Sequence, residues 1–120
     1  MKNFMNSVRF ALHGVRYTFA TEKNIRVLLF VFVCEIIAAI ILEISKIEFL
    51  LILGISALLF SLELINTAIE RLADKVSPQY DQQIGVVKDV MAGAVLVASV
   101  CAFLIGCVIF FDPVLKLIQQ

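Results

Sequence analysis

Several common signatures are missing from this sequence of 120 residues. Basic and acidic side chains are equal in number, so the formal net charge is zero and no basic surface for nucleic acid is indicated. There are three cysteines, all inside apolar runs, and this odd number argues against a disulfide framework. Neither a G-x-x-x-x-G-K-[ST] loop nor the glycine-rich loop of protein kinases is present. Charges recur through the first 26 residues, so we expect no cleaved signal peptide.

Hydrophobic residues, by contrast, are in excess and make up 62% of the chain. Soluble domains contain about 45–50% apolar residues. Three apolar runs, at residues 25–42, 47–69 and 90–111, have about the length that crosses a bilayer as a helix. The sequence therefore predicts an all-α membrane protein with one domain over residues 1–120. The short loop between the first two runs predicts an antiparallel hairpin.

Residues 2–23 show a different pattern, with apolar and polar side chains separated onto two faces of a helix. The apolar face carries Phe4, Val8, Leu12, Val15 and Phe19. The opposite face carries Lys2, Asn6, Arg9, His13 and Arg16. This spacing predicts an amphipathic helix that lies in the membrane interface, with its basic residues toward the lipid headgroups. Packing of its apolar face against the chain's own spans is the alternative, and both arrangements can hold together.

Lysine and arginine are distributed unevenly between the two sides of the predicted spans. Residues 1–26 hold five of them, the 70–89 loop holds three, and the 43–48 loop and the C-terminal tail hold one each. The positive-inside rule then places the N-terminus and the 70–89 loop in the cytoplasm and the C-terminus outside. Ser77-Pro78 stops the second long helix, which therefore runs on past the membrane to about residue 76.

The segment ELINTAIERLAD, residues 63–74, carries polar side chains along one face of that helix. At about 100° per residue, an arc of roughly 100° contains them all. They are Glu63, Asn66, Thr67, Glu70 and Asp74. Glu63 lies roughly 10 Å deeper in the membrane than Glu70. A charge near the bilayer centre costs about 2.5–3.5 kcal/mol, so these carboxylates indicate a functional site.

Three interpretations of this stripe follow from the residues alone. A polar seam between helices accounts for the asparagine and threonine but leaves each carboxylate without a partner. A proton-coupled transporter would use Glu63 and Glu35. An enzyme would use the acidic and basic groups that the topology brings to one level of the cytoplasmic side, which suit a divalent cation carrying phosphates. These groups are Glu22, Glu70, Asp74, Lys88 and Asp89.

The segment ELINTAIERLADKVSPQYDQQIGVVKDVMAGAVLVA resembles the hallmark segment of the prokaryotic diacylglycerol kinase family, which includes undecaprenol kinases. The pattern is approximately E-x-x-N-[ST]-A-[IL]-E-x-x-x-D, followed after about a dozen residues by K-D and small residues. The resemblance extends through GVRYTFATEKNIR at 14–26. It implies a homotrimeric membrane kinase with active sites between subunits, which transfers the γ-phosphate of MgATP to a lipid hydroxyl.

The resemblance also implies roles for individual residues. Glu63 would be the catalytic base, and Glu22 and Glu70 would hold Mg²⁺ with the phosphates of ATP. Further ATP contacts would come from Phe10, Gln79, Tyr80, Asp81, Lys88 and Asp89. Lipid contacts would come from Glu63, Asn66, Arg16 and Ala92, with Asp74 ordering the nucleotide site.

Some positions depart from the family pattern. Phe10 stands where some members have tyrosine, Asn3 aligns with an arginine of some members, and Arg26 lacks the histidine that often follows in undecaprenol kinases. Glu35 is an acid in mid-span where the family has none. We expect it either to be protonated at a subunit seam or to contribute to the lipid site. MAGAVLV and YTFATEKN favour undecaprenol as acceptor, with diacylglycerol as the alternative.

Overall fold

The computed structural model describes residues 2–120, which form four helices. These are α1 (Lys2–Thr21), α2 (Lys23–Ile41), α3 (Lys46–Val76) and α4 (Gln82–Gln119). No strand occurs in this part of the chain. Three helices, α2, α3 and α4, are long and apolar enough to cross a membrane. The all-α class and the three predicted spans are therefore confirmed.

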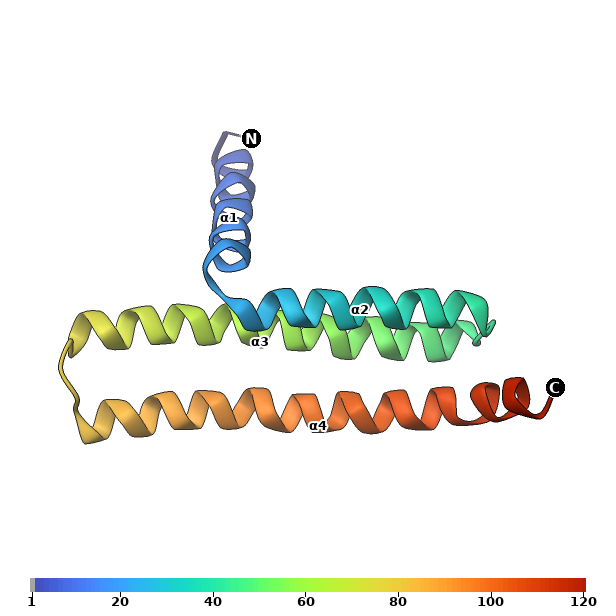
Figure 1. The fold of residues 1–120 in the computed structure, drawn as a ribbon. Helices are drawn as coiled ribbons and strands as arrows, with labels where there is room; N and C mark the ends of the chain where they lie inside the picture. The colour runs from blue at the N-terminus through green and yellow to red at the C-terminus, as the bar shows by residue number, and fades with distance from the viewer. Residues whose placement is uncertain (1) are drawn as a thin grey trace.

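The three long helices lie side by side as an antiparallel bundle, while α1 projects from it (Figure 1). The contact between α3 and α4 is the most extensive in the fold. Helix α1 leaves the bundle where α2 begins, so α3 and α4 continue past that point as a two-helix hairpin (Figure 1). At this junction the Phe60 ring of α3 stacks on Phe19 of α1 and meets Phe32 of α2 edge-on. The rings thus fix the end of α1 against the bundle.

Side-chain caps begin two of the long helices. Ser45 and Glu48 form a reciprocal capping box at the start of α3. Asp81 caps α4 by accepting hydrogen bonds from the backbone N–H groups of Gln83 and Ile84. These caps satisfy backbone donors that the first turn of a helix leaves unpaired.

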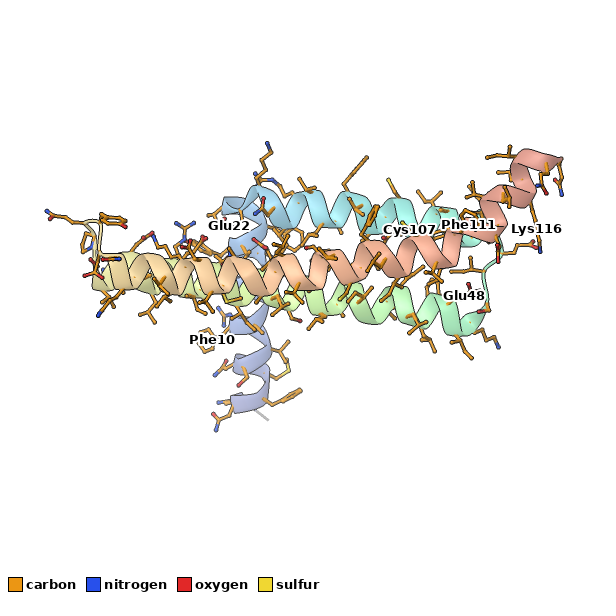
Figure 2. All side chains as sticks on the ribbon, turned by 90° about the horizontal axis from the view of Figure 1, so that it is seen from below. Phe10, Glu22, Glu48, Cys107, Phe111 and Lys116 are labelled. Carbon is orange, nitrogen blue, oxygen red and sulfur yellow. The ribbon has the colours of Figure 1, made fainter. Side chains whose placement is uncertain are left out.

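The helix that contains the predicted third span, residues 90–111, extends beyond that span at both ends. Helix α4 begins at Gln82 because the Asp81 cap starts it eight residues before the apolar run does. It also continues through Pro113 to Gln119. Figure 2 shows the end of α4 near Lys116 turned away from the axis of the rest of the helix, as expected after a proline in a helix. Helix α3, which contains the second predicted span, ends at Val76, as predicted.

The buried core of this single chain is small, and α3 contributes more residues to it than any other helix. Three buried alanines, Ala39, Ala73 and Ala98, let neighbouring backbones approach closely. Many larger apolar side chains, such as Phe30 and Val108, face outward. This arrangement suits a bundle whose surroundings are lipid or further protein, because outward apolar surface there is not exposed to water.

The N-terminal helix was predicted over residues 2–23 and ends slightly earlier, at Thr21. Thr18, near its C-terminal end, is its one buried residue among those described, and the apolar side chains of Phe4 and Leu12 are exposed. Packing against the chain's own spans is therefore limited to the C-terminal end of the apolar face, where Phe19 stacks on Phe60. Placement of α1 in the membrane interface stays a prediction.

Candidate active site

Glu63 forms the innermost part of the candidate site. Its side chain is only 2% exposed, and Thr67 beside it is also buried. The Thr67 hydroxyl donates to the Glu63 backbone carbonyl over 3.0 Å. The side-chain amides of Asn24 and Asn66 lie close to the Glu63 carboxylate. A carboxylate with amide donors around it satisfies its oxygens without needing a basic partner.

Asn24 was not predicted as a site residue. It lies in the first turn of α2, two residues after Glu22, and reaches Glu63 across the helix junction. The motif from which the site was predicted lies on α3 and α4, so it could not point to Asn24. The sequence did offer one signal for Asn24: this residue ends the polar stretch TEKN, which comes just before an apolar run.

A second layer of charged groups lies one to two turns closer to the connection between α3 and α4. Glu70 accepts a hydrogen bond of 3.4 Å from the Asn66 side-chain amide. Glu22, at the connection between α1 and α2, accepts a 2.8 Å hydrogen bond from the Arg71 guanidinium. Both carboxylates lie near enough to act electrostatically on Glu63. The predicted meeting of Glu22 with the α3 stripe is therefore present within one chain.

Arg71 is the second residue that sequence reasoning missed. Besides its ion pair with Glu22, its guanidinium lies over the Tyr17 ring at 5.8 Å from the centroid. Arg71 therefore joins α3 to the end of α1 and to the start of α2. It follows Glu70 directly in the sequence, but nothing in the motif distinguishes it from an ordinary surface arginine.

A third layer of charged groups lies where α3 and α4 extend past the other helices, near the connection between them. The Lys88 ammonium forms a 2.6 Å ion pair with the Asp74 carboxylate, which connects α4 to α3. The connection between these helices carries Gln79 and Tyr80, and Tyr80 is fully open to the surroundings. Asp81, which the resemblance assigns to ATP, already caps α4.

The remaining predicted site residues do not join these layers within one chain. Phe10 lies on the projecting part of α1, away from Glu22 (Figure 2). Phe10 and Arg16 line a shallow groove along α1 itself. Asp89 and Ala92 lie on exposed positions of α4. Any contact of these four residues with a ligand shared with Glu63 requires a second subunit or a ligand that spans the gap.

The carboxylates of the candidate site can fill only part of the coordination shell of a hard cation, so a bound ligand would have to supply the rest. No three His, Cys, Asp or Glu side chains converge on a metal position among residues 2–120. Two carboxylates, Glu22 from the connection between α1 and α2 and Glu70 from α3, lie near enough to Glu63 to act on it electrostatically. Mg²⁺ is held in many proteins by one or two carboxylates, with phosphate oxygens and waters completing its shell. The residues therefore fit Mg²⁺ that arrives with a phosphate ligand.

The fold and this site together define a class: a membrane protein with a buried carboxyl group below layers of charge that open toward a polar loop. Comparison with known families then identifies the chain more closely. A sequence model of the prokaryotic diacylglycerol kinase family matches residues 9–110. The chain belongs to this family.

Individual relatives agree with this assignment. A diacylglycerol kinase of Synechocystis is 38% identical over 96% of this chain and 66% of its own length. An undecaprenol kinase of Bacillus subtilis is 34% identical over 92% of this chain and 89% of its own length. A diacylglycerol kinase of Haemophilus influenzae is 27% identical over 92% and 95%, respectively. The family resemblance found in the sequence is thus confirmed, and relatives of both acceptor types are similar to this chain.

Proposed function

We propose that this protein is a lipid kinase, which transfers the γ-phosphate of MgATP to the hydroxyl of undecaprenol or diacylglycerol. The observation that carries the proposal is the order of polar groups along α3. Glu63 is deepest, Glu70 and Glu22 follow, and the Lys88–Asp74 pair lies nearest the loop. A lipid alcohol stays in the membrane and ATP stays in water, so a kinase that joins them needs this order.

Glu63 acts as the general base in this proposal. It takes the proton of the lipid hydroxyl as the hydroxyl oxygen forms a bond to the γ-phosphorus, and the bond from that phosphorus to ADP breaks. General base catalysis of this kind contributes about 10²–10⁴ in rate. Asn24 and Asn66 hold the Glu63 carboxylate in place. The buried position excludes water, which would otherwise compete with the lipid as acceptor.

The layers nearer the loop receive the nucleotide. Glu22 and Glu70 would hold Mg²⁺, which when bound neutralises charge on the phosphates of ATP. Lys88 supplies a positive charge for the phosphates, and Asp74 holds the Lys88 ammonium in position before ATP arrives. Because phosphoryl transfer depends mainly on alignment and electrostatic stabilisation, this small set of side chains is sufficient.

A homotrimer with shared active sites would complete the nucleotide site. Helix α1 carries Phe10 away from its own bundle (Figure 2), and in the proposed trimer this part of α1 would reach a neighbouring subunit. In this arrangement α1 rests on the cytoplasmic face of the inner membrane. The exposed apolar surface of the bundle gives neighbouring subunits a large area for packing.

The test is phosphate transfer by purified protein in mixed micelles, with diacylglycerol and undecaprenol offered separately and ATP labelled on its γ-phosphate. We expect labelled lipid phosphate from at least one acceptor, and none when Mg²⁺ is removed by a chelator. A well-folded protein that labels neither lipid in the presence of Mg²⁺ would refute the kinase proposal. Proton uptake into vesicles by that same protein would instead support a transporter.

A further inference from the structure

The end of α4 differs from the rest of this helix in how polar side chains are distributed around it. Residues 90–111 are apolar all round apart from Ser99, as expected of a membrane span. Beyond them, polar residues return at a helical spacing. At about 100° per residue they fall within an arc of roughly 60°. They are Asp112, Lys116 and Gln119.

The opposite side of the same segment is apolar. Its side chains line a shallow groove along the end of α4. They are Cys107, Phe110, Phe111, Val114, Leu115 and Ile118. Phe111 is 65% exposed and Ile118 is 76% exposed, so the described part of the chain leaves both uncovered. A helix with one apolar and one polar face suits a boundary between apolar and aqueous surroundings.

Two independent markers place the membrane boundary at the start of this segment. The apolar run of residues 90–111 is about 33 Å long as a helix, which matches the thickness of the hydrocarbon core, so a run that starts at one boundary ends at the other. The second marker is the capped start of α3, where the charged residues Lys46 and Glu48 precede its apolar part. Figure 2 shows Glu48 and Phe111 at about the same level along the bundle. The residues that follow Phe111 therefore lie at the level of the lipid headgroups.

Pro113 changes the direction of α4 at this boundary. Proline removes a backbone N–H and its ring clashes with the preceding turn, so the helix bends there. Figure 2 shows the part near Lys116 turned away from the axis of the bundle. A straight helix would carry the apolar side chains of Val114 and Ile118 out into water. A helix turned toward the membrane plane keeps them in contact with lipid.

We propose that residues 111–119 form an interfacial anchor in the leaflet opposite the α3–α4 connection, and we call it the α4 anchor. Its apolar face lies about 5–10 Å into the boundary between headgroups and acyl chains. Its polar face is directed toward headgroups and water, where the Lys116 ammonium can reach lipid phosphates. An anchor at one end of α4 fixes the depth of the whole helix, and so that of Lys88 near its other end. The inference does not depend on the kinase function and requires only that α4 spans the membrane.

The test uses a single introduced tryptophan, because the chain contains none. Ile118→Trp places the probe on the apolar face of the α4 anchor, and Gln119→Trp is its matched control on the polar face. Phe103→Trp, exposed within the span, is the reference for a deep position. All three substituted positions are exposed, so the chain should fold normally. Each full chain is reconstituted into phosphatidylcholine vesicles whose acyl chains carry bromine, a quencher of tryptophan, either near the carbonyl or near the methyl end.

We expect the emission of Ile118→Trp to be shifted to the blue of Gln119→Trp and to lose most intensity when bromine is near the carbonyl. Phe103→Trp should lose most when bromine is near the methyl end. Iodide added to the buffer should quench Gln119→Trp more than Ile118→Trp.

Three other results would overturn the inference. Equal emission and equal iodide quenching of Ile118→Trp and Gln119→Trp would show that the segment extends into water. Blue-shifted emission of Ile118→Trp that neither bromine nor iodide quenches would place this face against another copy of the chain. Quenching of Ile118→Trp that matches Phe103→Trp would place the segment inside the hydrocarbon core. None of these results bears on the kinase proposal, which fails only if the unchanged protein phosphorylates no lipid.

Discussion

The pairing of Glu22 with Arg71 allows the metal role of Glu22 to be separated from its structural role. Glu22→Gln and Arg71→Met both remove the same 2.8 Å ion pair. The Arg71 side chain is 49% exposed and that of Glu22 is 21% exposed. Pairs with such exposure contribute about 0–1 kcal/mol, so either substitution should lower stability only slightly. A structural role alone therefore predicts two variants with similar properties.

The proposed metal role predicts that the two variants differ. Glu22→Gln removes a ligand, while Arg71→Met leaves both carboxylates and removes a cation that competes for Glu22. We expect the Mg²⁺ concentration for half-maximal phosphate transfer to rise for Glu22→Gln by at least 10- to 100-fold, the loss known for changes to outer metal partners. For Arg71→Met it should stay the same or fall.

The assay is a Mg²⁺ titration of initial transfer rate at fixed total ATP, with the oligomeric state and thermal unfolding of each variant measured in the same detergent. Glutamine is nearly the size of glutamate, so the connection between α1 and α2 should keep its course. Equal Mg²⁺ requirements for the two variants would refute the reasoning. An unchanged requirement for Glu22→Gln would remove Glu22 from the metal site altogether.

Three further predictions concern other parts of the structure. Lys88→Met should raise KM for ATP about tenfold or more through loss of a charge-assisted contact, measured beside Lys116→Met at the far end of α4 as control. Asn24→Ala should lower kcat more than it changes KM for ATP, because it loosens the Glu63 carboxylate; equal effects on both would contradict this. Ser45→Ala should lower the free energy of unfolding by about 1 kcal/mol through loss of the capping box, without altering either KM, as denaturant titration and kinetics would show.

Much of the fold was predictable because membrane helices give strong local signals. Apolar runs of bilayer length located α2, α3 and α4, and Ser77-Pro78 marked the end of α3. The start of α4 was not predicted, because hydropathy detects only the apolar part of a helix. The eight residues that precede the apolar run are polar or mixed, and the Asp81 cap, rather than hydropathy, makes them helical.

The candidate site was predictable where its residues share one helix. The 3.6-residue period places Glu63, Asn66 and Glu70 on one face of α3, and the structure agrees. Contacts between helices were beyond this reasoning, because they depend on how far each helix is rotated and shifted. Arg71 with Glu22 and Asn24 with Glu63 are of this kind. So is the cavity lined by Glu35, because side chains of α2, α3 and α4 together form it.

The near-complete burial of Glu63 also came from tertiary packing and constrains how the lipid arrives. Within one chain the side chain is reached neither from water nor from an open groove. A lipid hydroxyl must therefore approach along the membrane, between helices or between subunits. Phe60, whose ring meets Phe19 and Phe32 next to Glu63, stands beside this approach.

The most direct test of the central claim is the rate of γ-phosphate transfer by Glu63→Gln compared with Glu48→Gln. Both glutamates belong to α3, and glutamine at 48 keeps the capping box, so the control changes the same group without touching the site. The account predicts a loss in kcat of about 10²–10⁴ for Glu63→Gln, with an intact oligomer, and little change for Glu48→Gln. Near-normal transfer by a folded Glu63→Gln would contradict the role of Glu63 as the base.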